Sequence, residues 1–325
     1  MSASFNCRIC GNDQGNRELT VREMMFGTKQ EFTYVKCASC ATLQAARIPN
    51  NLSDFYPSDY LGFQDKVVAA DVRVNGIRKF LRQQRVIHVL YGGSWLGWLA
   101  SKIGKDYFDY TWEWFRKGRV TPNSRILDVG CGRGYLLKSL QNQGFSNLSG
   151  VDPFQNKTLP NLSIHSCQLN ALTGQYDFIM SHHSLEHMPD PAEALSEFKR
   201  LCSPGGKILV RVPVADCQAW DQYGVEWFQI DAPRHLVIPS VRGMEILAER
   251  AGLRLDEIVY DSSELQFCCS EQYQQEIPLM EPRSYFRNRK TDLFTQTQID
   301  SFKQQANELN KAGRGDQACF YFTNT

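Results

Sequence analysis

The sequence has almost no net charge, because its 36 Lys and Arg residues are balanced by 35 Asp and Glu residues, for a formal charge of +1. A balanced chain lacks the long-range attraction to nucleic acid or to an anionic membrane that a strongly basic protein has. A local basic patch is compatible with this balance. RNA is therefore disfavoured as a partner, but it is not excluded.

The sequence also lacks long apolar runs. Its first residues are polar and lead into a cysteine pair rather than into the apolar stretch of a signal peptide, so we expect a cytoplasmic protein. No run of about 18 apolar residues occurs, so we expect no transmembrane helix. The nearest approach is 86–103, which glycines interrupt and basic residues flank. We expect a helix packed against the main domain there, with a surface that touches a membrane or an apolar substrate as the alternative.

The overall composition is typical of a globular protein, with 42% hydrophobic and 22% charged residues. A chain of 325 residues suggests two or three compact units. We expect a small unit over 1–46, a helical linker or lid region over 47–120, and the main domain over 121–325. Within the main domain, 261–317 is expected to be an insertion that covers the active site.

The main domain is expected to be an α/β domain, because short apolar runs alternate with helical patterns from residue 121 to residue 260. This alternation predicts a doubly wound, mostly parallel sheet. Seven strands are expected, at 125–129, 148–151, 162–165, 176–181, 207–212, 253–260 and 318–322. Helices are expected over 134–143, 191–201 and 241–250, and Gly144 stands where a left-handed residue ends the first of them.

The loop after the first expected strand reads Asp128-Val129-Gly130-Cys131-Gly132-Arg133-Gly134. Glycines let the chain turn sharply, and the helix that follows offers backbone N–H groups to a ligand. Asp152, eighteen residues after Gly134, ends the second expected strand, where a carboxylate can accept both hydroxyls of a ribose.

The spacing of this loop distinguishes three interpretations. Dinucleotide-binding loops run Gly-x-Gly-x-x-Gly, whereas this one runs Gly-x-Gly-x-Gly. Asp128 would repel a pyrophosphate and attract an ammonium group. S-adenosylmethionine (SAM) has an amino group, a ribose and no phosphate, so we favour SAM over a dinucleotide or a purely structural turn.

The loop resembles motif I of class I SAM-dependent methyltransferases, and four later features match that family in order: Asp152, Tyr176-Asp177-Phe178-Ile179, Ser184-Leu185-Glu186-His187 and Leu201-Cys202-Ser203-Pro204-Gly205-Gly206. The resemblance covers about residues 121–260. It implies a Rossmann-like sheet of seven strands whose last strand is antiparallel. It also implies a cofactor site made of Asp128, Gly130, Gly132 and Gly134 around the methionine end, Asp152 at the ribose, Asn170 at the adenine, and Ser181 and His182 beside the cofactor.

Four of the eleven cysteines form two pairs, Cys7-x-x-Cys10 and Cys37-x-x-Cys40, with 26 residues between them. Two such pairs can close a tetrahedral site around Zn²⁺, and a reducing cytosol favours this over a disulfide or redox role. Four thiolates leave no open position for water. We therefore expect a zinc ribbon whose metal is structural.

The zinc ribbon and the segment Phe55-Tyr56-Pro57-Ser58-Asp59-Tyr60 together resemble bacterial methyltransferases of sugar and cell-envelope glycan pathways. That group includes C-methyltransferases that act on nucleotide-linked sugars and carry an N-terminal Cys₄ unit. The resemblance implies a role in carbohydrate biosynthesis, with a sugar, nucleotide-sugar or glycan precursor as acceptor. Some rRNA methyltransferases also begin with a zinc finger, although their substrate usually demands a more basic protein.

Two histidines are candidates for the base that many methyl transfers need. His235 follows the fifth expected strand, at the sheet edge where ligands of α/β domains bind. It is interpreted as a base, as a partner that orders the substrate or the loop, or as a structural residue. In the zinc-bearing sugar C-methyltransferases an acid precedes the comparable histidine. Here Arg234 precedes it, and Arg234 could itself bind a phosphate or carboxylate of the substrate.

His187 is the second candidate. The Glu186-His187 pair recurs in family members with different substrates, which favours a scaffold or cofactor-positioning role. The expected insertion adds polar side chains that either contact the substrate or form a solvated surface: Ser262, Glu264, Gln266, Tyr273 and Tyr285.

Three functions therefore stay open. The first is a methyltransferase acting on a sugar or a related small metabolite. The second is a methyltransferase acting on RNA or on a quinone-like aromatic. The third is a non-catalytic module that only binds SAM or zinc.

Overall fold

The computed structural model describes residues 5–57, 76–103, 111–155 and 159–325. Its main element is a mixed sheet with the strand order β10-β11-β8-β7-β4-β5-β6. The strands are β4 (Arg125–Val129), β5 (Asn147–Val151), β6 (Ser163–His165), β7 (Tyr176–His182), β8 (Cys202–Pro213), β10 (Leu253–Tyr260) and β11 (Gln317–Asn324). Only β11 runs antiparallel to its neighbours, β8 and β10. The seven-stranded Rossmann-like sheet is confirmed, although β8 begins five residues before the expected Lys207.

Helices cover both faces of the sheet, because alternate residues of each strand point to opposite sides. Ile126 of β4 packs in a core with residues of α3 (Thr111–Lys117) and α4 (Tyr135–Gln143). Leu127 packs in a second core with residues of α5 (Pro191–Leu201) and α7 (Val241–Ala251). The ends of these helices follow the expected signals. Ser240 caps α7 by accepting a hydrogen bond from the Gly243 N–H, and Gly144 ends α4 with a φ of 105°.

The N-terminal sheet has the order β1-β2-β3-β9 and includes a strand from the main domain. Three strands come from the ribbon, β1 (Arg17–Arg22), β2 (Glu31–Lys36) and β3 (Leu43–Ala45), and the fourth, β9 (Val237–Ile238), comes from the main domain. Leu43 pairs with Ile238, and Gln44 pairs with Val237. Residues of the ribbon therefore share a core with the large sheet.

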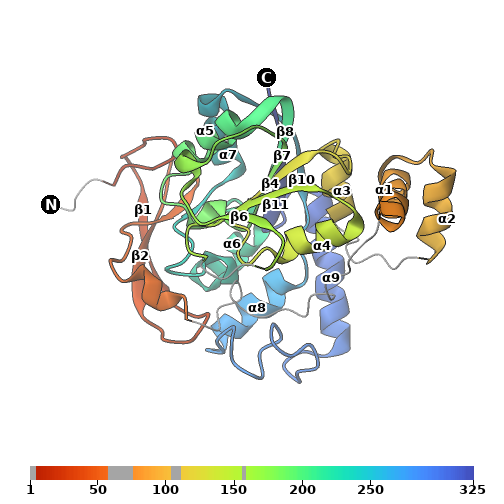
Figure 1. The fold of residues 1–325 in the computed structure, drawn as a ribbon. Coiled ribbons are helices and arrows are strands. Elements are labelled where there is room, and N and C mark those ends of the chain that lie inside the picture. The colour runs from red at the N-terminus through yellow and green to blue at the C-terminus, as the bar shows by residue number, and fades with distance from the viewer. Residues whose placement is uncertain (1–4, 58–75, 104–110, 156–158) are drawn as a thin grey trace.

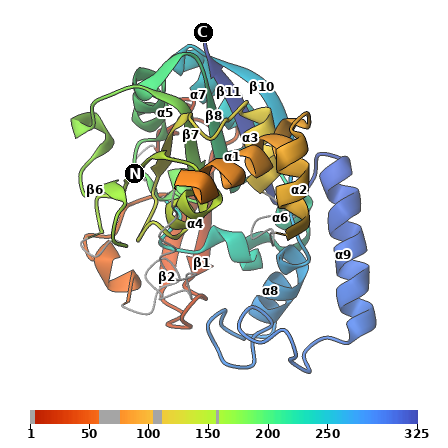
Figure 2. The ribbon, with the colours of Figure 1, turned by 45° about the vertical axis from the view of Figure 1, so that its right-hand side comes forward.

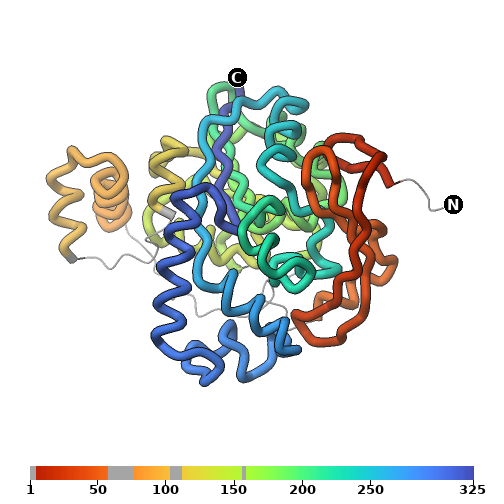
Figure 3. The backbone as a smooth tube through the Cα atoms, turned by 180° about the vertical axis from the view of Figure 1, so that it is seen from behind, coloured from red at the N-terminus to blue at the C-terminus, as the bar shows by residue number. Residues whose placement is uncertain are grey.

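The linker region is helical where it is described, with η1 (Leu52–Phe55), α1 (Gly76–Tyr91) and α2 (Trp95–Ile103). The expected single helix over 86–103 is wrong, because Gly92 and Gly93 have φ values of 73° and 81° and break it into two. We call α1 and α2 together the helical hairpin. It lies on the opposite side of the molecule from the ribbon (Figures 1 and 3). Ser58, Asp59 and Tyr60 of the glycan-type segment lie outside the described residues.

The segment between β10 and β11 carries α8 (Leu265–Gln274) and α9 (Gln296–Lys311), which lie together at one end of the molecule (Figures 1 and 2). The loops at the sheet edge hold shorter elements: η2 (Leu169–Ala171), η3 (Leu185–His187), α6 (Gln218–Tyr223), η4 (Gly224–Glu226) and η5 (Phe228–Ile230). Among the helices of the described ranges, none is both long enough and apolar enough to span a bilayer.

Candidate active site

The glycine loop connects β4 to α4 at the carboxyl edge of the sheet, and its shape depends on glycine. Gly130 has a φ of 74°, and a Cβ atom there would lie 2.3 Å from the Cβ atom of Ser184. The Gly130 N–H donates to the Val151 carbonyl at 2.8 Å, which ties the loop to the neighbouring strand. A side chain at this position would therefore force the loop away from the sheet.

Two acids lie close together in this loop. Asp128 is 4% exposed, and burial, reinforced by the charge of Asp152, raises its pKa to about 8. The Asp128 carboxylate has no hydrogen bond or ion pair with the residues that the structure describes. Asp152 accepts hydrogen bonds at 3.0 Å from the N–H groups of Gly132 and Phe154, and burial raises its pKa.

A buried carboxylate without a partner is costly, so the surroundings of Asp128 are suited to a cationic ligand. The ammonium and sulfonium groups of SAM are positively charged and could neutralise the carboxylates of Asp128 and Asp152. A pyrophosphate would add negative charge to the same place. The donor set therefore fits SAM, with Asp152 placed for the ribose hydroxyls.

The other expected cofactor residues lie around the loop in different settings. Ser181 is fully buried, with its Oγ atom 2.7 Å from the Ser184 Oγ. The Nε2 atom of His182 accepts a hydrogen bond from Arg211 at 2.8 Å. Asn170 is exposed in η2. The structure therefore brings Ser181 to the loop, while the ring of His182 is engaged by Arg211.

His187 and His235 meet beside this loop, with ring centroids 4.7 Å apart. The Nδ1 atom of His187 lies 2.9 Å from the Arg234 carbonyl, and that of His235 lies 2.7 Å from the Gln229 carbonyl. A carbonyl only accepts hydrogen bonds, so each imidazole carries its proton on Nδ1 when neutral. Each Nε2 atom is therefore left with a lone pair.

Burial and the neighbouring His187 lower the pKa of His235 to about 4, so His235 is neutral near pH 7. His235 is only 6% exposed, whereas His187 is partly exposed and its charge acts on Asp152. His187 therefore lies on the cofactor side of the pair, and His235 lies behind it.

Glu186 completes this group, which we call the Glu-His cluster (Glu186, His187 and His235). Burial opposes ionisation of Glu186, but the hydrogen bond from His183 at 3.0 Å and the nearby histidines lower its pKa to about 2. Its second oxygen, Oε2, is buried and has no hydrogen-bond partner among the residues that the structure describes. The ligand atoms of the cluster lie within 4.8 Å of one another, so the cluster could bind a proton or a metal ion.

Arg234 does not reach a ligand site. Its side chain is fully buried and pairs with Asp231 at 2.6 Å and Glu23 at 2.8 Å, and it donates to the Phe55 carbonyl at 3.1 Å. This placement favours a structural role over the expected contact with a phosphate or carboxylate. Arg234 joins the loop of His235 to the ribbon and to η1.

The ribbon holds the His235 loop from the other side. The Tyr34 hydroxyl donates to the His235 carbonyl at 2.8 Å, and Arg8 donates to the Leu236 carbonyl at 3.2 Å. Tyr56, which follows η1, places its hydroxyl 3.2 Å from the His187 Nδ1 atom. Local sequence does not indicate these roles for Tyr34, Tyr56 and Glu23, because each depends on a contact between residues more than 130 positions apart.

The four cysteines of the ribbon come together as expected. The Sγ atoms of Cys7 and Cys40 are 3.6 Å apart, and those of Cys10 and Cys37 are 3.5 Å apart. In a tetrahedral Zn–S₄ site with bonds of about 2.3 Å, neighbouring sulfurs lie about 3.8 Å apart. The Cys₄ cluster could therefore hold a metal ion of this size.

A second polar group, not expected from the sequence, lies along the carboxyl edges of β7, β8 and β10. Arg211 donates to the Nε2 atom of His183 at 2.6 Å and pairs with Asp261 at 2.6 Å. His183 has a φ of 50°, which is unusual for a residue with a side chain. The sequence feature that could have indicated this polar group is Arg211, a charged residue within the apolar run of β8.

The insertion contributes two kinds of side chain. Tyr273 is buried, and its hydroxyl lacks a partner among the described residues. Burial, followed by the charge of Asp231, raises the pKa of this hydroxyl. Gln266 is also buried, and its side-chain oxygen has no hydrogen-bond partner in the described part of the chain. The Tyr285 hydroxyl instead donates to Glu264 at 3.2 Å within the insertion, and Ser262 accepts a hydrogen bond from the Gln317 N–H at 3.0 Å. Tyr273 and Gln266 are therefore the better candidates for substrate contact.

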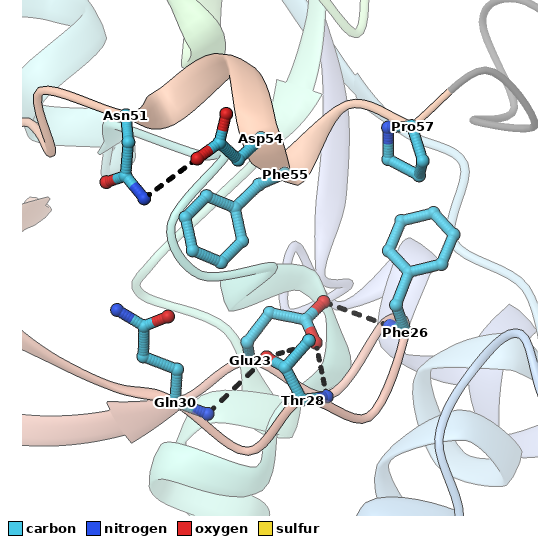
Figure 4. A pocket seen from close by; sticks show the side chains of 8 residues that line it. All are labelled: Glu23, Phe26, Thr28, Gln30, Asn51, Asp54, Phe55 and Pro57. Carbon is cyan, nitrogen blue, oxygen red and sulfur yellow. Dashed lines mark hydrogen bonds between the residues drawn. The ribbon is translucent and has the colours of Figure 1, made fainter.

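A pocket of about 470 Å³ is lined by residues of the N-terminal region, from the ribbon and from η1 and its flanks (Figure 4). Its lining residues are Glu23, Phe26, Thr28, Gln30, Asn51, Asp54, Phe55 and Pro57. None of them belongs to the glycine loop or to the Glu-His cluster. Its link to the site runs through Glu23, which also pairs with Arg234.

The comparisons with known proteins match the central part of the chain. A family model described as a methyltransferase domain matches residues 104–258. The ubiquinone biosynthesis O-methyltransferase of Pseudomonas aeruginosa (strain UCBPP-PA14) is 29% identical over 166 residues, which cover 45% of this chain and 71% of that protein. The enzyme of the same name from Erwinia tasmaniensis is 30% identical over 141 residues, 38% of this chain and 58% of that protein. For the corresponding Ralstonia nicotianae enzyme the match covers 46% of its length.

Similar solved structures carry related titles. One is a SAM-dependent methyltransferase from Mesorhizobium loti, at 17% identity and a TM-score of 0.39, covering 62% of this chain and 91% of that chain. Another is geranyl diphosphate C-methyltransferase from Streptomyces coelicolor A3(2), at 15% identity and a TM-score of 0.41, covering 63% and 73%.

Proposed function

We propose that this SAM-dependent methyltransferase transfers the methyl group of SAM to a hydroxyl group on a small, quinone-like aromatic molecule. The proposal starts from the methyltransferase domain and the seven-stranded fold. What it adds is the acceptor, a hydroxyl group. The observation that carries it is the Glu-His cluster, in which the Nδ1 atoms of both imidazoles are held by backbone carbonyls. The Nε2 atom of His235 faces Glu186 at 4.0 Å, and His187 is the member of the pair whose charge acts on Asp152.

The cofactor supplies an electrophilic methyl group on a sulfonium. Asp128 would hold its ammonium group, the glycine loop its methionine end, and Asp152 its ribose. Asp128 is buried, so its charge would act on the ammonium group with little screening by water. Binding at this edge would put the methyl group on the side of the sheet where His187 lies.

A hydroxyl becomes a good nucleophile only when its proton is removed as the new bond forms. We assign that proton to the Nε2 atom of His187, the more exposed member of the pair. The acceptor oxygen forms a bond to the methyl carbon while the carbon–sulfur bond breaks, and its electrons stay on sulfur. Glu186, ionised and buried, stabilises the imidazolium that results. His235 acts as a positioning residue behind His187.

The quinone-like acceptor is favoured over the sugar acceptor because the curated relatives quoted above are named for ubiquinone biosynthesis and O-methylation. A phenolic hydroxyl is also the easier group for a histidine to deprotonate, with a pKa near 10 like that of tyrosine.

A sugar, nucleotide-sugar or glycan precursor, the acceptor expected from the sequence, is the second candidate. The matches quoted above give it no support, and Arg234 is not available for a phosphate. The observation in its favour is the number of polar side chains at the sheet edge, including Tyr56, His183 and Arg211, which suit a polyhydroxylated molecule.

We also propose that the Cys₄ cluster holds Zn²⁺. Four thiolates would fill the coordination sphere, so the metal would supply no open position for chemistry. Its role would be to fix the ribbon, whose residues Tyr34 and Arg8 hold the backbone of the His235 loop.

The experiment that tests the acceptor class is a competition. The purified protein is incubated with methyl-labelled SAM and two panels, one of dihydroxylated aromatic rings and one of nucleotide sugars. We expect label in the aromatic panel. Label found only in the sugar panel would reverse the order of the two candidates, and label in neither panel would contradict both.

The base is tested separately. His187→Ala should lower kcat by about 10²–10⁴-fold, the usual contribution of a general base. The SAM dissociation constant, measured by calorimetry, should change little. Replacing His165, which lies in β6 outside the cluster, is the matched control. Turnover of His187→Ala within a few-fold of the unaltered enzyme would eliminate His187 as the base.

A further inference from the structure

The helical hairpin has a surface that the proposed reaction does not use. In α1, the residues Ile77, Phe80 and Leu81 are exposed, Ile77 to 73%. In α2, Trp95, Trp98 and Leu99 are exposed, Trp95 to 70% and Trp98 to 49%. Each set follows the i, i+3, i+4 spacing that puts three side chains on one face of a helix.

The rest of the hairpin is firmly attached to the main domain. Val86 and Leu90 of α1 are buried in a core with residues of α3 and α4. The Gln83 side chain donates to the Gly144 carbonyl at 3.1 Å, at the end of α4. The exposed apolar face is therefore held in place on a folded support.

The two helices pack tightly against each other. A Cβ atom at Gly97 of α2 would lie 2.1 Å from the Gln84 carbonyl of α1, so only glycine allows this approach. Ser94 binds the Gln84 side chain at 2.8 Å. The two apolar triplets thus belong to one rigid element that stands away from the sheet (Figures 1 and 3).

The hairpin carries a net positive charge. Residues 76–103 contain five Lys and Arg and no Asp or Glu, whereas the whole chain is nearly neutral. Lys79 and Lys102 are exposed, and the Lys102 ammonium lies 5.6 Å from the ring centre of Trp98. A basic element with exposed tryptophans matches the composition of segments that lie in the headgroup region of a bilayer.

We propose that the helical hairpin docks this protein on an anionic lipid surface. Trp95, Trp98 and the α1 triplet would enter the headgroup region, and the lysines would meet lipid phosphates. The charge argues against a second copy of the chain as the occupant, because a symmetric contact would bring positive surface against positive surface. Protein interfaces are also depleted in lysine.

The test is sedimentation of the full-length protein with vesicles of phosphatidylcholine alone or of phosphatidylcholine and phosphatidylglycerol in equal parts. We expect binding to the mixed vesicles, weakened by added salt, and at least about ten-fold weaker binding to the neutral vesicles. A lack of binding to the mixed vesicles at low salt would overturn the proposal.

Two double variants test the charge and the apolar face. Lys79→Gln with Lys102→Gln should weaken binding about 25-fold, at about five-fold for each cation. Lys290→Gln with Lys303→Gln, exposed lysines of the insertion, is the matched control and should bind normally. Trp95→Ser with Trp98→Ser should remove binding, whereas Phe154→Ser, an exposed aromatic outside the hairpin, should leave it intact.

Two results would contradict the proposal. One is vesicle binding that survives both hairpin variants. The other is a dimer in light scattering that Trp95→Ser with Trp98→Ser converts to a monomer, without vesicle binding by either form. Thermal unfolding shows whether each variant is folded. The assay contains no methyl acceptor, so its failure would leave the proposed reaction untouched.

Discussion

At the scale of single residues, the main feature of the site is the buried acid Asp128, which has no cationic partner among the described residues and lies near the half-buried Asp152. Burial, reinforced by the charge of Asp152, raises the pKa of Asp128 to about 8. The protein alone therefore keeps a proton on Asp128 below pH 8. Cofactor binding should replace that proton with the ammonium group of SAM.

This exchange predicts a pH optimum for SAM affinity near pH 8. Below pH 8, binding must first remove the proton from Asp128, so the affinity falls as the pH falls. Above pH 8, the amino group of SAM loses its own proton, since α-amino groups titrate at about 7.7–8.0. Calorimetry from below to above pH 8 measures the SAM dissociation constant on both sides of this optimum, the acidic limb and the basic limb.

Asp128→Asn should weaken SAM binding about 10–100-fold, the usual effect of losing a charged hydrogen bond, and should abolish the acidic limb. Asp292→Asn, an exposed acid of the insertion, is the control. An affinity for the unaltered protein that does not change between pH 6 and pH 8 would contradict the assigned role of Asp128.

Glycine 130 carries a second prediction at this scale, with a matched control within the chain. Gly130 and Gly205 both have a φ of 74°, but a Cβ atom at Gly205 would meet nothing within 4 Å. Gly205→Ala should lower the free energy of unfolding by about 1–2 kcal/mol, the strain of a left-handed residue. Gly130→Ala should lower it further and remove SAM binding, because its Cβ atom would clash with Ser184. Equal unfolding midpoints for the two variants in urea would contradict this difference.

At the scale of elements, the decisive connection is between the ribbon and the loop that carries His235. The strand β9 belongs to the main domain but completes the ribbon sheet, and the Arg234 ion pairs reach Glu23 near the end of β1. We therefore expect the ribbon to support the candidate active site. A disturbed ribbon should affect the chemistry more than the binding of SAM, whose loop lies on β4 and β5.

Metal removal tests this connection. Cys10→Ser, or treatment with a chelator, should lower kcat at least about ten-fold, as expected when outer-shell support of a site is lost. The dissociation constant of SAM should stay within a few-fold. Cys167→Ser, outside the Cys₄ cluster, is the control, and metal analysis confirms the loss of zinc. A kcat that is unchanged when zinc has been lost would show that the ribbon does not support the site.

At the scale of the whole molecule, the sequence predicts the large sheet well, because each strand is a short apolar run next to a local signal. Gly144 ends α4 and Ser240 begins α7, as their residue types indicate. The same local signals cannot show that Val237 and Ile238 pair with the ribbon, since that contact joins segments about 190 positions apart. They also could not show that Arg234 is buried between two acids, because an arginine beside a histidine has the same pattern whether it faces solvent, substrate or core.

The glycines of the linker illustrate a similar limit. The run over 86–103 has the composition of one helix, yet Gly92 and Gly93 turn it into a hairpin. In the candidate site, too, features with a local sequence signal were predictable, and features that depend on distant contacts were not. The local sequence of the glycine loop is enough to predict candidate cofactor residues, and their role in binding SAM stays a prediction. The contacts of Tyr34, Tyr56 and Arg211 with the histidines and their loop depend on the folded chain and have no local signal.

The central claim, methyl transfer from SAM to oxygen, is tested most directly by the position of the new methyl group. The enzyme is supplied with ¹³C-methyl SAM and the aromatic acceptor that gains label, and the product is examined by NMR. The account predicts a single ¹³C methyl resonance in the range of a methyl ether, formed at a rate that His187→Ala sharply lowers. A methyl resonance bonded to carbon or nitrogen, or an unlabelled acceptor despite tight SAM binding, would contradict it.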